Sequence, residues 1–199
     1  MNTFKIIRLV AWGSILVLTL ALTYLLLVPR DKNTGTGIAD IGGSFSMAAA
    51  DGSTVSNTSL AGKPYALFFG FTQCPDVCPT SMLEITNDMN ALGDKARDFR
   101  VLFVTVDPER DDAALLKDYT SSFDPRIIGL VPKNDAELAE MTRKFRAIYR
   151  KVDTPSGYTM DHTASVYLMD GKGQFFGTLD SKETPAVRQA KLRRLLDRG

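Results

Sequence analysis

Residues 65–80 read YALFFGFTQCPDVCPT, and this stretch decides the fold class. The run from Tyr65 to Phe71 is continuously apolar and rich in aromatic side chains, which is typical of a strand buried on both faces of a sheet. It leads directly into Cys74 and Cys78, each of which is followed by a proline. Ligands of open α/β folds bind beyond the carboxyl ends of the strands. The sequence therefore predicts a functional site at the two cysteines.

Strand and helix patterns alternate on both sides of this stretch. Residues 45–56, with Asp51-Gly52 in the middle, predict a hairpin before it. After it we expect buried strands and helices in turn, with strands at 101–106, 127–131, 165–169 and 174–179 and helices at 79–92, 112–122, 134–145 and 184–197. Buried strands separated by helices predict an α/β layer fold with a largely parallel central sheet, to which the last two strands add an antiparallel edge.

The prolines beside the cysteines predict their local geometry. Pro79 has no N–H and disfavours the α conformation at Cys78, so we expect a helix to begin at Pro79 with Cys78 as its cap. Both sulfurs then lie near the positive end of the helix dipole, which favours the thiolate. Thiolates serve soft-metal binding and disulfide exchange alike. Two packed structural thiols are a third reading, although a turn after a core strand is an unusual place for them.

Composition and charge narrow the class of protein. The chain has 199 residues, 44% hydrophobic and 24% charged, which suits one globular domain with an appendage. The formal net charge is +1, and no basic stripe is present, so nucleic-acid binding is excluded. The two cysteines are too close in sequence to form a disulfide framework. Only one histidine occurs, so any imidazole chemistry must use His162.

The amino-terminal segment predicts a membrane anchor. Residues 9–28 are largely apolar and would span about 30 Å as a helix, the thickness of a bilayer's hydrocarbon core. Lys5 and Arg8 precede this run, so the positive-inside rule places residues 1–8 in the cytoplasm. Residues 29–43 then form a linker to the domain at 44–199. The alternative is a cleaved signal peptide, but the run is longer than usual and offers no small-x-small cleavage site.

Three motifs together resemble the Sco/SenC family: FGFTQCPDVCP at 69–79, VTVDPERD at 104–111 and MDHTA at 160–164. They occur in the family's order within a stretch that runs from Ile41 to the carboxyl terminus. The resemblance implies a thioredoxin-like domain with a central mixed sheet flanked by helices. It also implies copper binding and a part in assembling the binuclear copper centre of cytochrome c oxidase. Gln73 differs from many members, at a position that is not a ligand in the family.

The resemblance also implies roles for particular residues. Cys74, Cys78 and His162 are the expected metal ligands, and two thiolates with one neutral imidazole suit Cu(I) and, with an added ligand, Cu(II). His162 stands where thioredoxin-like proteins usually carry a cis-proline facing the cysteine turn. Asp107 matches the family's acidic position, and we expect it to contact a partner or the surroundings of the metal. We expect Asp161 to orient the imidazole ring.

Asp111 follows the same acidic turn, and we expect it to cap the next helix.

The function implied is that of a membrane-anchored copper chaperone rather than an enzyme. Its domain would lie on the periplasmic side of a bacterial inner membrane and deliver copper to the apo copper-binding subunit of cytochrome c oxidase. Another copper chaperone and a thioredoxin-like reductant are further expected partners.

The alternative is a thiol-disulfide oxidoreductase that uses Cys74 and Cys78 as a redox pair to reduce a copper protein's cysteines. Against a general oxidoreductase, the usual Cys-x-x-Cys spacing is absent. Against a peroxidase, no Thr/Ser-x-x-Cys element surrounds Cys74. Structural zinc requires four protein ligands, and only three are expected here.

Overall fold

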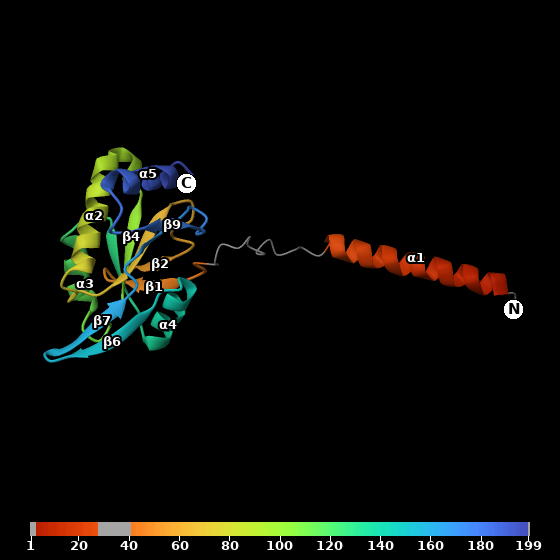
Figure 1. Ribbon diagram of the computed structural model, residues 1–199, viewed down its shortest axis with the longest axis horizontal. Helices are drawn as coiled ribbons and strands as arrows, with labels where there is room; N and C mark the ends of the chain where they lie inside the picture. Colours follow the sequence, from red (N-terminus) through yellow and green to blue (C-terminus); the bar gives the residue numbers. More distant parts are fainter. Residues whose placement is uncertain (1–2, 28–40, 199) are drawn as a thin grey trace. The chain divides into compact units, whose positions relative to one another are not determined.

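The computed structural model describes residues 3–27 and 41–198, which belong to two separate units. One unit contains helix α1 (Thr3–Leu27), and the other contains every other element (Figure 1). Within the described ranges, no helix combines the length and the apolar character needed to cross a membrane. The expected transmembrane span at 9–28 stays a prediction. Its last residue and residues 29–40 of the expected linker lie outside the described residues.

The second unit is built on a seven-stranded mixed sheet with the order β2-β1-β5-β4-β3-β8-β9. Its strands are β1 (Ser46–Ala49), β2 (Thr54–Ser56), β3 (Tyr65–Gly70), β4 (Arg100–Thr105), β5 (Ile127–Val131), β8 (Val166–Met169) and β9 (Phe175–Leu179). The three central strands β3, β4 and β5 run parallel, while β1 and β8 join them antiparallel on either side. The predicted hairpin before β3 and the antiparallel edge formed by β8 and β9 are both confirmed.

Strand β3 lies at the centre of the core, as its apolar run predicts. All six of its residues are buried. Neighbouring side chains of a strand point to opposite faces, so Phe68 packs on Phe103 (ring centroids 5.8 Å apart), whereas Phe69 packs on Phe145 on the other face (6.0 Å). Burial on both faces explains why the run has no polar alternation.

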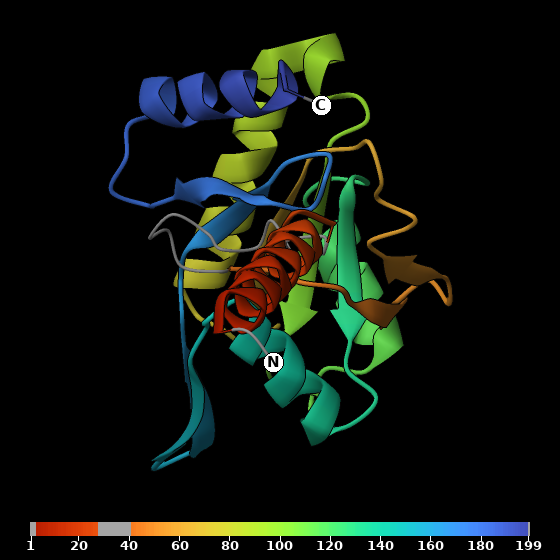
Figure 2. The same ribbon diagram turned by 90° about the vertical axis from the view of Figure 1, so that its right-hand side faces the viewer.

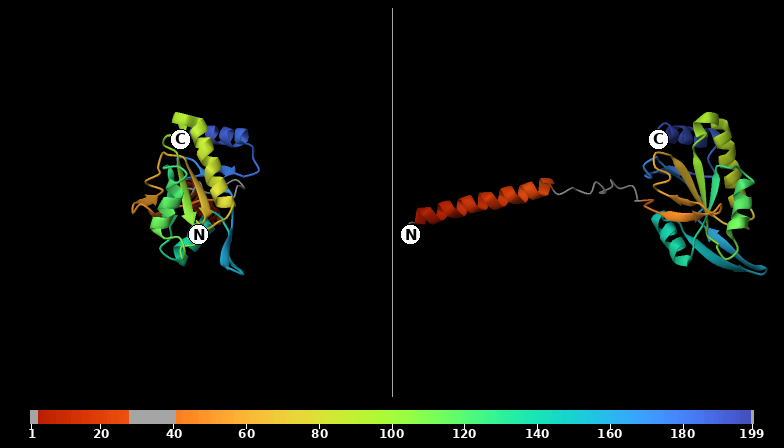
Figure 3. Two further views of the ribbon diagram at one scale, coloured as in Figure 1. Left: turned by 90° about the vertical axis from the view of Figure 1, so that its left-hand side faces the viewer. Right: turned by 180° about the vertical axis from the view of Figure 1, so that it is seen from behind.

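Four helices cover the sheet, namely α2 (Val77–Leu92), α3 (Ala113–Ser121), α4 (Asp135–Lys144) and α5 (Pro185–Leu196). Helix α4 lies on the opposite face of the sheet from α2 and α3 (Figures 1 and 3). Helix α5 packs against α2 and the short 3-10 helix Gly93–Ala96 that follows it. The side chain of Asn134 caps α4 by accepting from the Glu137 N–H at 2.9 Å, as predicted.

One element was not predicted from the sequence. Strands β6 (Tyr149–Thr154) and β7 (Gly157–His162) form a two-stranded sheet of their own, which projects from the domain (Figures 1 and 2). All of its residues are exposed or half-buried. A strand with neither face fully buried has no need of the apolar run or the strict alternation by which strands are recognised.

Residues 41–43 belong to the expected linker, but one of them, Gly42, forms a hydrogen bond with the domain. The Gly42 N–H donates to the Lys144 carbonyl oxygen at 2.8 Å.

Candidate metal centre

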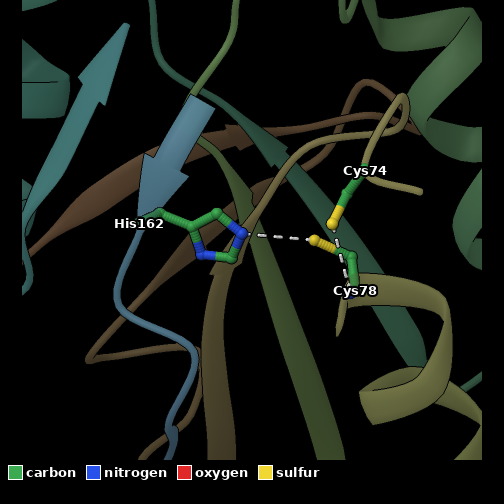
Figure 4. Close-up of side chains that lie close together, drawn as sticks. All are labelled: Cys74, Cys78 and His162. Carbon is green, nitrogen blue, oxygen red and sulfur yellow. Dashed lines mark hydrogen bonds between the residues drawn. The ribbon is translucent and has the colours of Figure 1, made fainter. Parts of the chain in front are cut away.

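Cys74, Cys78 and His162 meet at one point of the structure (Figure 4). One potential ligand atom from each residue lies within 4.8 Å of the other two. The Cys78 Sγ is 3.4 Å from the His162 Nε2, and the Cys78 backbone N–H donates to the Cys74 Sγ at 3.4 Å. Cys78 has no exposed surface, whereas Cys74 and His162 are half-buried. The structure thus brings together the three residues expected as ligands.

The two cysteines come from the segment that joins β3 to α2. Cys74 lies in the turn after the strand, where its N–H donates to the Phe71 carbonyl at 3.3 Å. Helix α2 begins at Val77 with Asp76 as its cap, so the expectation that the helix begins at Pro79 is wrong. Pro79 is the third residue of the helix, where an N–H has no intrahelical partner, so the missing donor costs nothing. Cys78 therefore lies inside the first helical turn.

The two thiols in the metal-free site have very different pKa values. The hydrogen bond with Cys78 is the main cause that lowers the pKa of Cys74 to about 3, and backbone N–H groups lower it further, against the effect of burial. The pKa of Cys78 is raised, because its proton is shared with the Cys74 sulfur and because the thiol is buried. The lowered pKa of Cys74 and the raised pKa of Cys78 favour a thiolate at Cys74 and a proton at Cys78. A metal bound by both sulfurs must displace that proton.

His162 is the last residue of β7, and its ring is fixed from several sides. Its Nδ1 lies 3.1 Å from the Thr163 carbonyl oxygen. A carbonyl oxygen only accepts, so we assign the ring proton to Nδ1, which leaves the Nε2 lone pair facing the sulfurs. The rings of Phe68 and Phe71 pack edge-on against the imidazole, each with a centroid distance of 5.8 Å and an interplanar angle of 89°. A neutral imidazole with a free Nε2 is a suitable metal ligand.

The structure does not bring Asp161 to the imidazole ring. Neighbouring side chains of β7 point to opposite faces, so Asp161 and His162 point in different directions. The Asp161 carboxylate instead pairs with the Arg150 guanidinium across the hairpin at 3.0 Å, and both side chains are exposed. The Thr163 carbonyl takes the place beside Nδ1 that we expected Asp161 to fill.

Asp107 lies beside the site rather than among the three clustered residues. Its side chain is 3% exposed. It accepts hydrogen bonds from the Tyr158 hydroxyl at 2.9 Å and from the Arg110 Nε. Arg110 in turn donates from Nη1 to the Gln73 side-chain oxygen at 3.2 Å, so Asp107 is connected to the cysteine turn through one side chain.

Asp111 has a different place from the helix cap expected of it. Asp112 caps α3, accepting from the Leu115 N–H at 2.8 Å. Asp111 is fully buried and accepts from the Thr72 N–H at 3.0 Å, the Thr72 hydroxyl at 2.6 Å and the Thr105 hydroxyl at 2.6 Å. It therefore fixes the turn that carries Cys74. The sequence offers one signal for this role: Asp111 and Asp112 are adjacent, and only one of them can cap the helix.

The geometry defines a class of protein: a mixed α/β domain with a candidate soft-metal site between a helix start and a facing strand end. The family model described as SCO1/SenC matches residues 33–197. This chain belongs to the SCO1/SenC family.

Solved structures and a curated relative agree with this assignment. Bradyrhizobium japonicum ScoI with copper bound is 46% identical, with a TM-score of 0.71 over 78% of this chain and 99% of that one. Yeast Sco1 with copper bound is 31% identical, also with a TM-score of 0.71, over 79% of this chain and 89% of that one. Protein SenC of Rhodobacter capsulatus is 32% identical over 158 residues, which cover 78% of this chain and 71% of that protein. The thioredoxin-like fold implied by the family resemblance is confirmed.

Proposed function

We propose that this chain is a copper chaperone that binds one copper ion through Cys74, Cys78 and His162 and passes it to the copper-binding subunit of cytochrome c oxidase during assembly. The observation that carries the proposal is the convergence of these three ligand atoms within 4.8 Å. Two thiolates make a soft pair suited to Cu(I), and an imidazole adds the harder donor that Cu(II) favours. The family membership and the copper-bound structures of relatives support the same metal.

The exposure of the site suits the release of a metal. Cys74 is half-buried, so a partner's sulfur can approach copper from that side while the buried Cys78 still holds it. Among the residues that the structure describes, three side chains at this site can serve as metal ligands, namely Cys74, Cys78 and His162. A structural zinc site normally closes with four protein ligands, so this group fits a transferable metal better than a structural one.

The direct test is copper analysis of the purified full-length protein after reduction. Wild-type protein is expected to bind one copper per chain. Cys74→Ser and Cys78→Ser should each abolish tight binding, because the chain has no third cysteine. His162→Ala should spare Cu(I), which two thiolates bind alone, and should impair Cu(II).

Asp161→Asn is the matched control, because it changes the neighbouring residue on the opposite face of β7. The proposal fails if the wild type binds no more copper than the double cysteine variant. Delivery is tested in cells grown with little copper. There either cysteine variant should lose cytochrome c oxidase activity, and added copper should restore it.

One observation favours a second function, the reduction of a partner's disulfide. The lowered pKa of Cys74 keeps it a thiolate, which is the attacking species in thiol-disulfide exchange. Mixing the reduced metal-free chain with the oxidised copper-binding subunit tests this function. Reduction of the partner would convert Cys74 and Cys78 to a disulfide in equal amount. A chain that only delivers copper and does not reduce its partner would keep both thiols reduced in this experiment.

We also propose that the domain works on the periplasmic side of a bacterial inner membrane, attached through its amino-terminal segment. A second copper chaperone and a thioredoxin-like reductant would then be its further partners. The support is in the sequence, where Lys5 and Arg8 precede the apolar residues 9–28. Cell fractionation tests the attachment, since an anchored chain sediments with membranes. A chain recovered in the soluble fraction would contradict it.

A further inference from the structure

The element that carries His162 is weakly attached to the rest of the domain. Strands β6 and β7 pair only with each other and do not join the seven-stranded sheet. A two-stranded hairpin is at best marginally stable on its own in water. The distance between the imidazole and the two sulfurs therefore depends on side-chain contacts that tie this hairpin to its neighbours.

Tyr158 makes one group of such contacts, besides the packing of His162 itself on Phe68 and Phe71. It lies four residues before His162, so both side chains point to the same face of β7. Its ring lies between two cations, with the Arg110 Cζ 3.7 Å and the Lys151 Nζ 3.9 Å from the ring centroid. Its hydroxyl donates to the Asp107 carboxylate at 2.9 Å. The hairpin is thereby joined to the loop that follows β4.

Arg110 extends this connection to the cysteine turn. Its Nη1 donates both to the Tyr158 carbonyl oxygen at 3.0 Å and to the Gln73 side-chain oxygen at 3.2 Å. Its Nε donates to the buried Asp107 carboxylate, which fixes the guanidinium in place. Gln73 directly precedes Cys74. One guanidinium thus bridges the strand that carries His162 and the turn that carries Cys74.

We propose that Arg110 and Tyr158 are positioning residues, a clasp that sets His162 against the two sulfurs and so determines how well the site binds Cu(II) relative to Cu(I). The inference rests on the proposed copper site. Opening the clasp loosens the hairpin, so that only the local contacts with Phe68, Phe71 and the Thr163 carbonyl still position its imidazole. It leaves the sulfurs in place, because α2 and the hydrogen bonds of Asp111 fix the cysteine turn independently. Two thiolates suffice for Cu(I), whereas Cu(II) needs the nitrogen as well.

The test compares Cu(I) and Cu(II) affinities of full-length Tyr158→Ala and Arg110→Ala with those of the wild type. Residues that orient a metal ligand typically change affinity by about 10–100-fold, and we expect a loss of that size for Cu(II) with unchanged Cu(I) affinity. The thiolate-to-Cu(II) absorption band and the nitrogen hyperfine signal should weaken in parallel. Retained Cu(I) binding shows that the variants fold.

Further variants separate the parts of the clasp. Tyr158→Phe keeps the stacked ring and loses only the hydroxyl, so its Cu(II) loss should be smaller than that of Tyr158→Ala. Arg110→Lys should not restore the wild-type ratio, because an ammonium lacks the planar fork that bridges two acceptors. The variant that carries both Tyr158→Ala and Arg110→Ala should lose no more Cu(II) affinity than the weaker-binding of the two single variants, because both residues act in one contact. Asp153→Asn is the matched control, since Asp153 is exposed and lies opposite Tyr158 in the hairpin.

The proposal is overturned if Tyr158→Ala keeps the Cu(II)-to-Cu(I) affinity ratio of Asp153→Asn, or if both affinities fall together. Amide exchange of the metal-free protein tests the clasp without copper. Tyr158→Ala should speed exchange in β6 and β7 while β3 and β4 stay protected, and equal exchange in the wild type and the variant would refute the clasp. Failure of the wild type to bind copper would instead refute the proposed function, and the amide exchange would still decide whether the clasp exists.

Discussion

Cys74 should react as a thiolate at pH values where an ordinary cysteine is protonated. The perturbation that tests this is Cys78→Ala, which removes the contact with the largest effect on the pKa of Cys74. Because that pKa is lowered to about 3, the thiolate is already fully formed at pH 5. We therefore expect the alkylation rate of Cys74 in the metal-free wild type to be flat between about pH 5 and 7.

The loss of the hydrogen bond in Cys78→Ala sets how steeply the alkylation rate of Cys74 should then rise with pH. A thiol with an ordinary pKa of about 8.5 gains about tenfold in thiolate per pH unit below that value, or about 100-fold from pH 5 to 7. Cys78→Ala should move the profile of Cys74 toward this slope. The absolute rate is a poor measure, because a thiolate becomes less nucleophilic as its pKa falls (Brønsted slope about 0.4–0.5).

Iodoacetamide labelling over this pH range, read by mass spectrometry of the labelled peptides, measures each cysteine separately. Cys78 should stay almost unlabelled in the wild type, since it is buried and its pKa is raised. A wild-type rate for Cys74 that rises about tenfold per pH unit between pH 5 and 7 would refute the reasoning. So would a flat profile that survives the removal of Cys78.

Three further predictions concern stability and are measured by denaturant unfolding. Asp111→Ala leaves three hydrogen-bond donors without an acceptor, the buried Thr105 hydroxyl and the half-buried N–H and hydroxyl of Thr72, and should lower the free energy of unfolding by about 3 kcal/mol. The cap variant Asp112→Ala should lose only about 1 kcal/mol, and equal losses would contradict this. Asp88→Ala removes the closest acceptor of the buried Arg188 guanidinium, which is 2.7 Å from Asp88 and keeps Glu84 at 3.3 Å. The loss should therefore lie near the lower end for a broken buried pair, about 3 kcal/mol, and a loss below about 1 kcal/mol would show that the pair does not matter. Arg146 has a φ of 52°, so Arg146→Gly should stabilise the domain by about 1 kcal/mol, and a destabilised variant would refute that.

The layer fold followed from sequence patterns whose cause is burial. The strand at 65–70 is buried on both faces, and that environment selects a continuous apolar run that can be recognised without a structure. The same holds for 101–105, which pairs with it. The strand at 127–131 pairs with 101–105 in turn and is largely buried. Helix starts marked by a capping side chain, such as Asn134, were also predictable because the cap is local.

The parts that were missed depend on contacts between distant residues. Strands β6 and β7 lie at the edge of the domain, and one of their contacts with it is the stacking of Tyr158 on Arg110, 48 residues apart in sequence. The role of Asp111 depends on Thr72, 39 residues earlier. The preference of proline for the first helical position does not locate the start of α2, because the whole first turn of a helix tolerates a missing N–H and Pro79 is its third residue.

Copper K-edge X-ray absorption of the copper-loaded full-length protein tests the central claim most directly, because it counts the atoms bound to the metal. The account predicts two sulfur ligands and one imidazole nitrogen in the wild type. His162→Ala should lose the nitrogen and keep both sulfurs. A wild-type spectrum with only nitrogen and oxygen ligands, or one unchanged in His162→Ala, would contradict a site built from Cys74, Cys78 and His162.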